Sequence, residues 1–221
     1  MTQKIIMAED LDTGKLETRL MARQTDRGQV FVTGPVSEEE LTTWRMEDGL
    51  RSFRPPEQQK EALITITGMK HGQVFVARYE DTIIGYVTFH APEEFERWSE
   101  SSLNNIVELG AIEICPAWRN YGLGKSLLKV AFAEEVFEEY IVLATEYYWH
   151  WDLKGTDLNE WKYRDLMSRL MGTVDMIPMG TDDPEITSHP ANMLMVKIGS
   201  KVTEGDIFEF NNLRYKYKRM L

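Results

Sequence analysis

Residues 109–128, LGAIEICPAWRNYGLGKSLL, constrain the fold most strongly, because they join three kinds of segment without a break. The apolar stretch before Pro116 has the composition of a buried strand, and a short glycine-containing turn follows it. Beyond the turn, apolar residues from Leu127 to Val136 recur at the spacing of a helix. A strand that leads through a tight turn into a helix is typical of proteins in which helices pack on a mixed sheet.

The turn lacks the spacing of two common phosphate-binding loops. A P-loop requires a glycine five positions before the glycine of its Gly-Lys pair, and Arg119 occupies that position relative to Gly124. A dinucleotide-binding turn requires a third glycine where this chain has Leu127. The pattern that remains is Arg-x-x-Gly-x-Gly.

This remaining pattern has the properties of an anion site. Gly122 and Gly124 carry no Cβ, so a ligand can approach the backbone closely. The amides of residues 120–126 are expected at the positive end of the following helix, where Arg119 and Lys125 add positive charge. We therefore expect the turn to hold a pyrophosphate.

Strands and helices alternate through the rest of the chain, with hairpins in its first half. Ser37 and Glu40 have the spacing of a capping box at a helix start. In 188–199, Ser188 is placed to cap a helix and Gly199 to end it. These signals predict strands in 15–24, 28–34, 72–90 (a hairpin), 104–115, 140–149 and 175–183, and helices in 35–44, 53–66, 122–140, 157–171, 188–199 and 203–221.

Charge and cysteine content narrow the classes of function. The 36 acidic side chains outnumber the 25 basic ones, and the net charge of −11 argues against general nucleic-acid binding. No apolar run approaches the roughly 18 residues of a membrane span, and the N-terminal residues do not form a secretory signal peptide. Cys115 is the only cysteine, so we expect a core thiol rather than a disulfide framework or a cysteine metal cluster. Together these features indicate a cytoplasmic protein.

Three features follow one another as in the GCN5-related N-acetyltransferases (GNAT): the hairpin at 75–89, the unit at 109–128 and the segment at 189–202. The chain resembles this family over roughly residues 70–200. The resemblance implies one acetyltransferase domain over 1–221, with the acetyl-CoA-binding core at roughly 70–200. It implies an α/β (α+β) fold with a mixed central sheet, helices on both faces, and inserted and C-terminal helices. Acetyl-CoA would be the co-substrate, and no metal is implied. The motif assigns cofactor contacts to Ile112, Ile114, Arg119, Gly122, Leu123, Gly124, Lys125 and Ser126.

Two further blocks resemble a narrower group, the acetoin-utilization acetyltransferases of Bacillus-type bacteria. They are EYYWHWDLKG at 146–155 and DPEITSHPAN at 183–192, and neither is a general feature of GNAT enzymes. This resemblance implies acetylation of a lysine of acetyl-CoA synthetase, which inactivates that enzyme in acetoin and acetate metabolism. It allows a stable complex with the substrate protein and implies no nucleic-acid or membrane partner.

The reaction needs a neutral amine, and at pH 7 deprotonating a lysine of ordinary pKa costs about 4–5 kcal/mol. Glu108 and Glu113 are the candidate bases, and Glu108 lies eleven residues before Arg119, the spacing of the catalytic glutamate in histone-modifying family members. Strand alternation places the two glutamates on opposite faces unless Gly110 marks a bulge. Either could instead be a salt-bridged or solvent-facing glutamate. His189, at an expected helix start, either contacts substrate and relays a proton or serves only as a turn residue.

The family's usual general acid is a tyrosine four residues before the glycine that ends the late helix. Counting back from Gly199, that position holds Met195. Tyr147, Tyr148 and Tyr163 are candidate substitutes, although aromatic side chains more often line a core or a cleft. Alternatively, no acid is needed, because a thiolate leaves readily.

The run YYWHWD, around His150, has two interpretations. It is a protein-contact surface, or it is a buried strand that runs into a loop. Arg51 and Arg54 either guide an acidic patch of a substrate or decorate a helix entry. The candidate partner-binding residues are Arg51, Arg54, Tyr148, Trp149, His150 and Trp151.

Two other functions also fit the sequence. The first is an acetyl-CoA-sensing protein that holds or inhibits a partner with little turnover, an idea that rests on Met195 in place of the tyrosine. The second is acetylation of a small amine, which requires a closed acidic pocket. The aromatic loop and the additional helices favour a protein substrate over a small amine.

Overall fold

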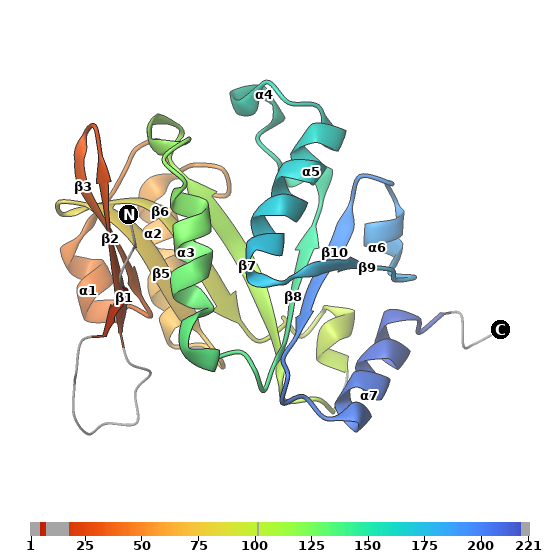
Figure 1. Cartoon of the computed structure of the whole chain (residues 1–221). Coiled ribbons are helices and arrows are strands. Elements are labelled where there is room, and N and C mark those ends of the chain that lie inside the picture. Colours follow the sequence, from red (N-terminus) through yellow and green to blue (C-terminus); the bar gives the residue numbers. More distant parts are fainter. Residues whose placement is uncertain (1–4, 8–17, 101, 218–221) are drawn as a thin grey trace. The chain divides into compact units, whose positions relative to one another are not determined.

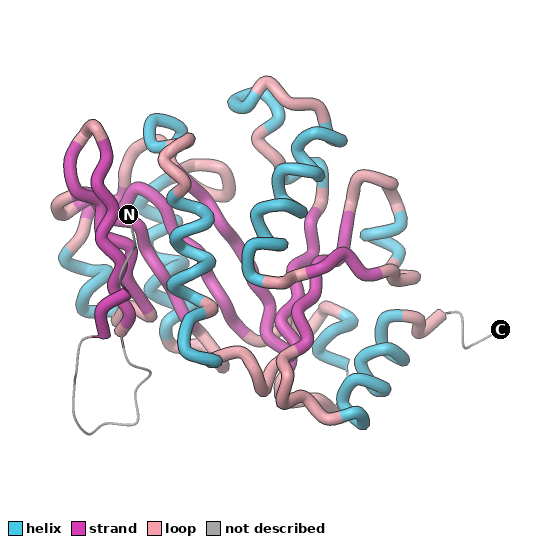
Figure 2. The backbone as a smooth tube through the Cα atoms, in the orientation of Figure 1, coloured by secondary structure: helices cyan, strands magenta, loops and turns pink. Residues whose placement is uncertain are grey.

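The computed structural model describes residues 5–7, 18–100 and 102–217, which form two compact units. Unit 1 comprises Met1–His90 and Ala111–Ala133, and unit 2 comprises Ala91–Gly110 and Glu134–Leu221. Strand β7, Ile106–Ile114, contributes its first part to unit 2 and its last part to unit 1. Both units contain strands and helices, which Figure 2 distinguishes by colour.

The strands of unit 1 form two antiparallel hairpins that lie next to each other in the sheet. The first hairpin is β2 (Arg19–Thr25) with β3 (Gly28–Gly34), and the second is β5 (Gln73–Tyr79) with β6 (Thr82–His90). β3 pairs with β5 and thereby joins the hairpins. Both hairpins confirm the sequence-based expectation. Two short strands complete this part, β1 (Ile5–Met7) beside β2 and β4 (Arg45–Met46) parallel to β6.

Helices lie on both sides of these strands. Figure 1 shows α3 (Leu123–Ala131) in front of β5 and β6 and α2 (Pro56–Thr67) behind them, and both helices contact these strands. Helix α1 (Glu38–Thr43) begins with the predicted capping box. The Glu40 amide donates to the Ser37 hydroxyl at 3.2 Å, and the Ser37 amide donates to the Glu40 carboxylate at 2.8 Å.

Helix α3 ends at Ala131, although the apolar spacing predicts a helix to residue 140. The reason lies on β2, where the buried Arg19 side chain donates hydrogen bonds to the carbonyl oxygens of Ala131 and Ala133, at 2.9 and 3.0 Å. These bonds satisfy carbonyl groups that a continuing helix would otherwise have bonded. A contact between residues more than 100 positions apart therefore sets the helix end.

Unit 2 is built around β8 (Ile141–Glu146), which is parallel to the first part of β7 and antiparallel to β10 (Met193–Ile198). β10 also pairs with β9 (Ile177–Met179), so β8, and not β9, is the neighbour of β7. The presence of parallel and antiparallel pairs makes the sheet mixed. The helices of this unit are α4 (Leu153–Thr156), α5 (Glu160–Met171), α6 (Pro184–Thr187) and α7 (Glu204–Arg214), with 3₁₀ turns at Arg97–Glu100, Tyr148–His150 and Gly172–Val174.

The prediction of a helix over 188–199 is wrong, because Met193–Ile198 forms strand β10. A short apolar run is compatible with either structure, and here pairing with strands on both sides decides for a strand. Gly199 is consequently not a helix terminator. A Cβ at Gly199 would lie 2.3 Å from the carbonyl oxygen of Glu138, so glycine is needed for a close approach of two backbone segments.

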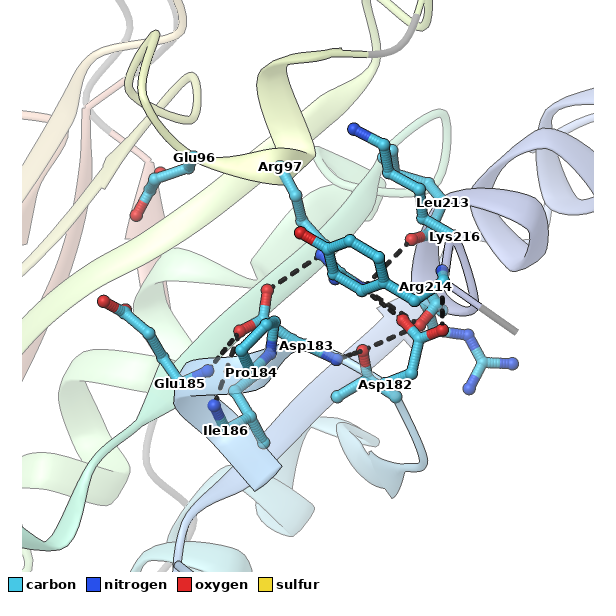
Figure 3. A network of polar contacts seen from close by, with 12 residues as sticks. Glu96, Arg97, Asp182, Asp183, Pro184, Glu185, Ile186, Leu213, Arg214 and Lys216 are labelled. Atoms are coloured by element: carbon cyan, nitrogen blue, oxygen red, sulfur yellow. Dashed lines mark hydrogen bonds and ion pairs between the residues drawn. The ribbon is translucent and has the colours of Figure 1, made fainter. Parts of the chain in front are cut away.

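A buried arginine ties three segments of unit 2 together (Figure 3). Arg97 forms ion pairs with Asp182 at 2.6 Å and Asp183 at 2.9 Å, and it donates to the carbonyl oxygens of Leu213 and Arg214. The 3₁₀ turn that carries Arg97 is thereby fixed to the start of α6 and the end of α7. In the described part of the chain, no helix is both long enough and apolar enough to span a membrane.

Candidate active site

The glycine motif forms the entry to α3 in unit 1. Gly122 is the N-cap residue and has a φ of +69°, in the left-handed region that glycine adopts without strain. Leu123, Leu127 and Leu128 are buried and hold the helix against the strands. The motif is therefore presented by a firmly packed helix start, as the sequence predicts.

The first turn of α3 differs from those of α1, α5 and α7. Those helices are capped by the side chains of Ser37, Asn159 and Thr203, whereas within the described residues no side chain caps α3 and its first turn holds no acidic residue. Amide groups at the positive end of a helix that lack a protein cap are suited to an anion. Lys125 is exposed at this turn.

The half-buried Arg119 belongs to the same loop, one residue beyond the 3₁₀ turn Pro116–Trp118. Trp118 is buried and packs its ring on Tyr79, with ring centroids 5.0 Å apart. The structure thus brings Arg119, Gly122 and Lys125 into one loop on a rigid base.

Ile112 and Ile114, the remaining predicted cofactor residues, lie in the last part of β7. The Cδ1 atom of Ile114 occupies the space where a Cβ on Gly85 would be, at 2.5 Å, so this side chain packs on β6. Any contact of Ile114 with a cofactor would therefore be made by its backbone. In the described residues of unit 2, the β7–β8 ladder ends at the pair Glu108–Leu143, although β8 continues to Glu146.

Glu113 is buried in unit 1, and both of its carboxylate oxygens accept hydrogen bonds. The Ser52 amide donates to one oxygen at 2.9 Å, and the Tyr86 hydroxyl donates to the other at 2.6 Å. Burial and the adjacent carboxylate raise the pKa of Tyr86 far above its usual range. These bonds anchor the loop that carries the exposed Arg51 and Arg54 side chains, so the geometry gives Glu113 an anchoring role.

Glu108 lies in unit 2 with a different set of partners. Its side chain is buried, and the Thr145 hydroxyl donates to it at 3.1 Å. Burial raises the pKa of Glu108 well above the ordinary glutamate value, and the charge of Glu96 and a hydrogen bond between the two carboxyl groups raise it further. A buried carboxyl group with a raised pKa has the properties of a general base or acid.

Glu96 was not identified from the sequence, because it lies in an irregular segment without hydrophobic periodicity. Its position depends on its neighbour Arg97, whose ion pairs are shown in Figure 3. The Glu93 amide also donates to the Glu96 carboxylate at 2.9 Å. The Glu93 amide on one side of Glu96 and the ion pairs of Arg97 on the other therefore hold the Glu96 carboxyl group in place.

His189 lies in a turn between α6 and β10, not at a helix start as expected. Its Nδ1 accepts a hydrogen bond from the Ala191 amide at 3.2 Å, and its ring lies 4.2 Å from the Tyr148 ring, measured between centroids. The ring of Trp161, which sequence reasoning missed, is 6.4 Å away on α5. Trp149 and Trp161 are about half exposed, at 49 % and 47 %.

The aromatic run divides into an outward and an inward part. Trp149 stacks on Tyr147 with centroids 4.8 Å apart, and His150 is exposed beside them. Trp151 instead donates its indole N–H to Glu146 at 2.7 Å and stacks on Tyr163. Burial raises the pKa of Glu146 to about 7, against the opposing effect of the indole hydrogen bond.

The comparison of Met195 with the family's tyrosine does not hold, because Met195 lies inside β10, paired with Ala144 and Pro178. The helix that follows β8 and is closed by a glycine at its C-cap is α5, and the glycine is Gly172. Ser168 stands four residues before it, so this helix also lacks a tyrosine at that position. Among the residues that the structure describes, no group of three or more His, Cys, Asp or Glu side chains could hold a metal ion.

The chain is similar in sequence to a known family and to named proteins. Residues 39–150 match the Acetyltransferase (GNAT) family. The acetoin utilization protein AcuA of Bacillus licheniformis is 47% identical over 197 residues, and AcuA of Bacillus subtilis is 45% identical over 197 residues. In both cases the similarity covers 89% of this chain and 94% of the relative.

A solved structure is also similar over most of this chain. The crystal structure of an acetoin utilization protein from Exiguobacterium sibiricum is 42% identical and has a TM-score of 0.88. The similarity covers 94% of this chain and 99% of that chain. This likeness confirms the expected α/β fold with a mixed sheet.

Proposed function

This chain belongs to the GCN5-related N-acetyltransferase family, and we propose that it transfers the acetyl group of acetyl-CoA to a lysine of acetyl-CoA synthetase during acetoin utilization. The chain as a whole, 1–221, would act as one acetyltransferase domain with its cofactor core at roughly 70–200. Acetylation would inactivate the synthetase. The relatives named for acetoin utilization support the metabolic setting.

Acetyl-CoA is the co-substrate of this N-acetyltransferase, and the loop before α3 fits its pyrophosphate. The observation that carries this fit is the first turn of α3, which has no side-chain cap, no acidic residue and a left-handed glycine at its start. In the proposal, the amides of Leu123, Gly124 and Lys125 hold the phosphates, with Arg119 contributing charge. When bound, acetyl-CoA supplies an acetyl group activated as a thioester.

Glu108 is the base in this proposal. The lysine nitrogen attacks the acetyl carbonyl carbon, its proton passes to the Glu108 carboxylate, and the C–N bond forms as the C–S bond breaks. The sulfur leaves as a thiolate and is protonated by solvent. A raised pKa makes Glu108 a stronger base than an ordinary glutamate, and the Thr145 hydroxyl keeps its carboxylate oriented. A backbone amide of β7 would stabilise the developing oxyanion.

A protein acceptor is favoured by the exposed aromatic surface of unit 2. The rings of Tyr148 and Trp161 lie beside His189, and Trp149 packs on Tyr148. Tryptophan and tyrosine contribute strongly to protein interfaces. The acetyl-CoA-sensing alternative rests on the missing tyrosine. Met195 lies within β10, but the matching position of α5 holds Ser168, so this alternative stays open until acetyl transfer is measured.

Acceptor selectivity tests the proposal. CoA release would be followed with acetyl-CoA and one of three acceptors: acetyl-CoA synthetase, a polyamine or an aminoglycoside. The proposal predicts turnover with the synthetase alone. Turnover with a polyamine or an aminoglycoside only would support the small-amine alternative. Binding of acetyl-CoA without turnover of any acceptor would support the sensing alternative.

A further inference from the structure

Two arginines on β2 lie at opposite ends of α3, both within unit 1. Arg19 and Arg23 are four residues apart, so their side chains leave the same face of the strand, about 13 Å from each other. Helix α3 has 9 residues and is likewise about 13 Å long. Arg19 bonds the carbonyl oxygens at the C-terminal end, where a cation is favourable.

Arg23 lies at the other end. Its Nη1 atom is 3.4 Å from the Ser126 hydroxyl oxygen, and its Nη2 atom is 3.1 Å from the position that a Cβ on Gly122 would occupy. Both neighbours belong to the first turn of α3. A cation at the positive end of a helix is electrostatically unfavourable, and an anion bound between the two removes this cost.

No protein group provides that anion within the described residues, because none of the ion pairs found there involves Arg23. Asp26, at the tip of the β2–β3 hairpin, accepts a hydrogen bond from the Tyr121 hydroxyl. The guanidinium of Arg27 lies over the Trp118 ring at 5.1 Å. These two contacts fix the hairpin tip against the glycine loop, so the position of Arg23 is part of a packed arrangement.

We infer that Arg23 binds a phosphate group of CoA at the start of α3. The residue lies outside the Arg-x-x-Gly-x-Gly motif and before residues 39–150, which match the family, so it is a contribution of the N-terminal hairpin. A guanidinium can make two parallel hydrogen bonds to a phosphate, which an ammonium cannot. CoA carries phosphate in its pyrophosphate and in its 3′-phosphate, and either could be the partner.

Calorimetric titration with CoA and with dephospho-CoA tests the inference. Arg23→Met keeps the aliphatic stem but removes the charge, and it is expected to weaken CoA binding by about 10- to 100-fold. An equal loss for both ligands would assign Arg23 to the pyrophosphate, and a loss for CoA alone would assign it to the 3′-phosphate. Arg45→Met, at an exposed arginine paired with Asp81, is the control for a general loss of positive charge.

The inference is overturned if folded Arg23→Met binds CoA within about 2-fold of the wild type, or if Arg45→Met loses as much affinity. If Arg23→Met does not fold, CoA binding is measured with Arg23→Lys instead. This variant keeps the positive charge but lacks the planar guanidinium that makes two parallel hydrogen bonds. A loss of several-fold is then expected, and unchanged affinity would contradict the inference. The inference rests on acetyl-CoA as co-substrate, but the titration contains no acceptor, so failure of the proposed lysine substrate would not affect its result.

Discussion

The carboxyl group of Glu96 interacts with that of Glu108 in unit 2 and raises its pKa, although the two residues are twelve positions apart in the sequence. Two carboxyl groups that interact in this way repel each other when both are ionised. The pair therefore holds a proton at a pH where an isolated glutamate would have lost it. The Arg97 ion pairs in Figure 3 fix the segment that supplies Glu96.

Replacing Glu96 should move the pH dependence of acetyl transfer. Glu96→Gln removes the like charge that raises the pKa of Glu108, so the pKa of Glu108 should fall and the base should be available at lower pH. The acidic limb of the kcat/KM profile should accordingly shift to lower pH. Glu94→Gln, at an exposed position of the same segment, is the matched control and should leave the limb in place. If the pH profile of Glu96→Gln is unchanged, Glu96 does not raise the pKa of the group that limits acetyl transfer at low pH.

The two candidate bases should respond differently to removal of their charge. Glu108→Gln should lower kcat by about 10²- to 10⁴-fold with acetyl-CoA affinity unchanged. Glu113→Gln should cost about 1–3 kcal/mol of stability, because Ser52 and Tyr86 donate to different carboxylate oxygens and one of these becomes an NH2 group, which cannot accept. Its effect on kcat should be smaller. Rapid-mixing kinetics and urea unfolding of both variants provide the comparison. If kcat falls more in Glu113→Gln, the assignment of the base is reversed.

Glu146 should make stability depend on pH. Its pKa in the folded chain is about 7, above that of an unfolded glutamate, so the folded state binds the proton more tightly. Protonated Glu146 therefore adds at most about 3 kcal/mol to the free energy of unfolding. This stabilisation is fully present below pH 4.5 and is lost as pH rises towards 7. Glu146→Gln should therefore flatten the fall in unfolding free energy between these pH values. Equal pH dependence in the variant and the wild type would show that Glu146 does not titrate in this range.

The Arg97 network should be essential for the stability of unit 2. Arg97→Met leaves the carboxylates of Asp182 and Asp183 without their partner in a largely buried site, and a loss of about 3–5 kcal/mol is expected. Arg45→Met removes an arginine from a fully exposed pair and should change stability little. Urea denaturation measures both. A similar, small effect of the two substitutions would mean that the buried pairs contribute no more than an exposed one.

Features set by neighbouring residues could be predicted from the sequence. The capping box of Ser37 and Glu40, the hairpin of β5 and β6 and the turn at Gly122 each depend on a few consecutive positions. Local rules for caps, alternation and glycine therefore suffice for them.

Features set by distant contacts could not be predicted in this way. β10 looks like a helix until its pairing with β8 and β9 is known, and α3 ends early because Arg19 reaches its carbonyl groups. The same reason explains why the sequence pointed to Glu108 but not to Glu96, and to Arg119 but not to Arg23. In each pair the second residue comes from a segment without a motif and reaches the site only through folding.

Mass spectrometry of acetyl-CoA synthetase, after incubation with acetyl-CoA and this protein, tests the proposed function most directly, with Glu108→Gln in parallel. We expect one acetyl group on a single lysine, a fall in synthetase activity that follows the modification, and much slower modification by the variant. An unmodified synthetase, in the presence of a protein that measurably binds acetyl-CoA, would contradict it.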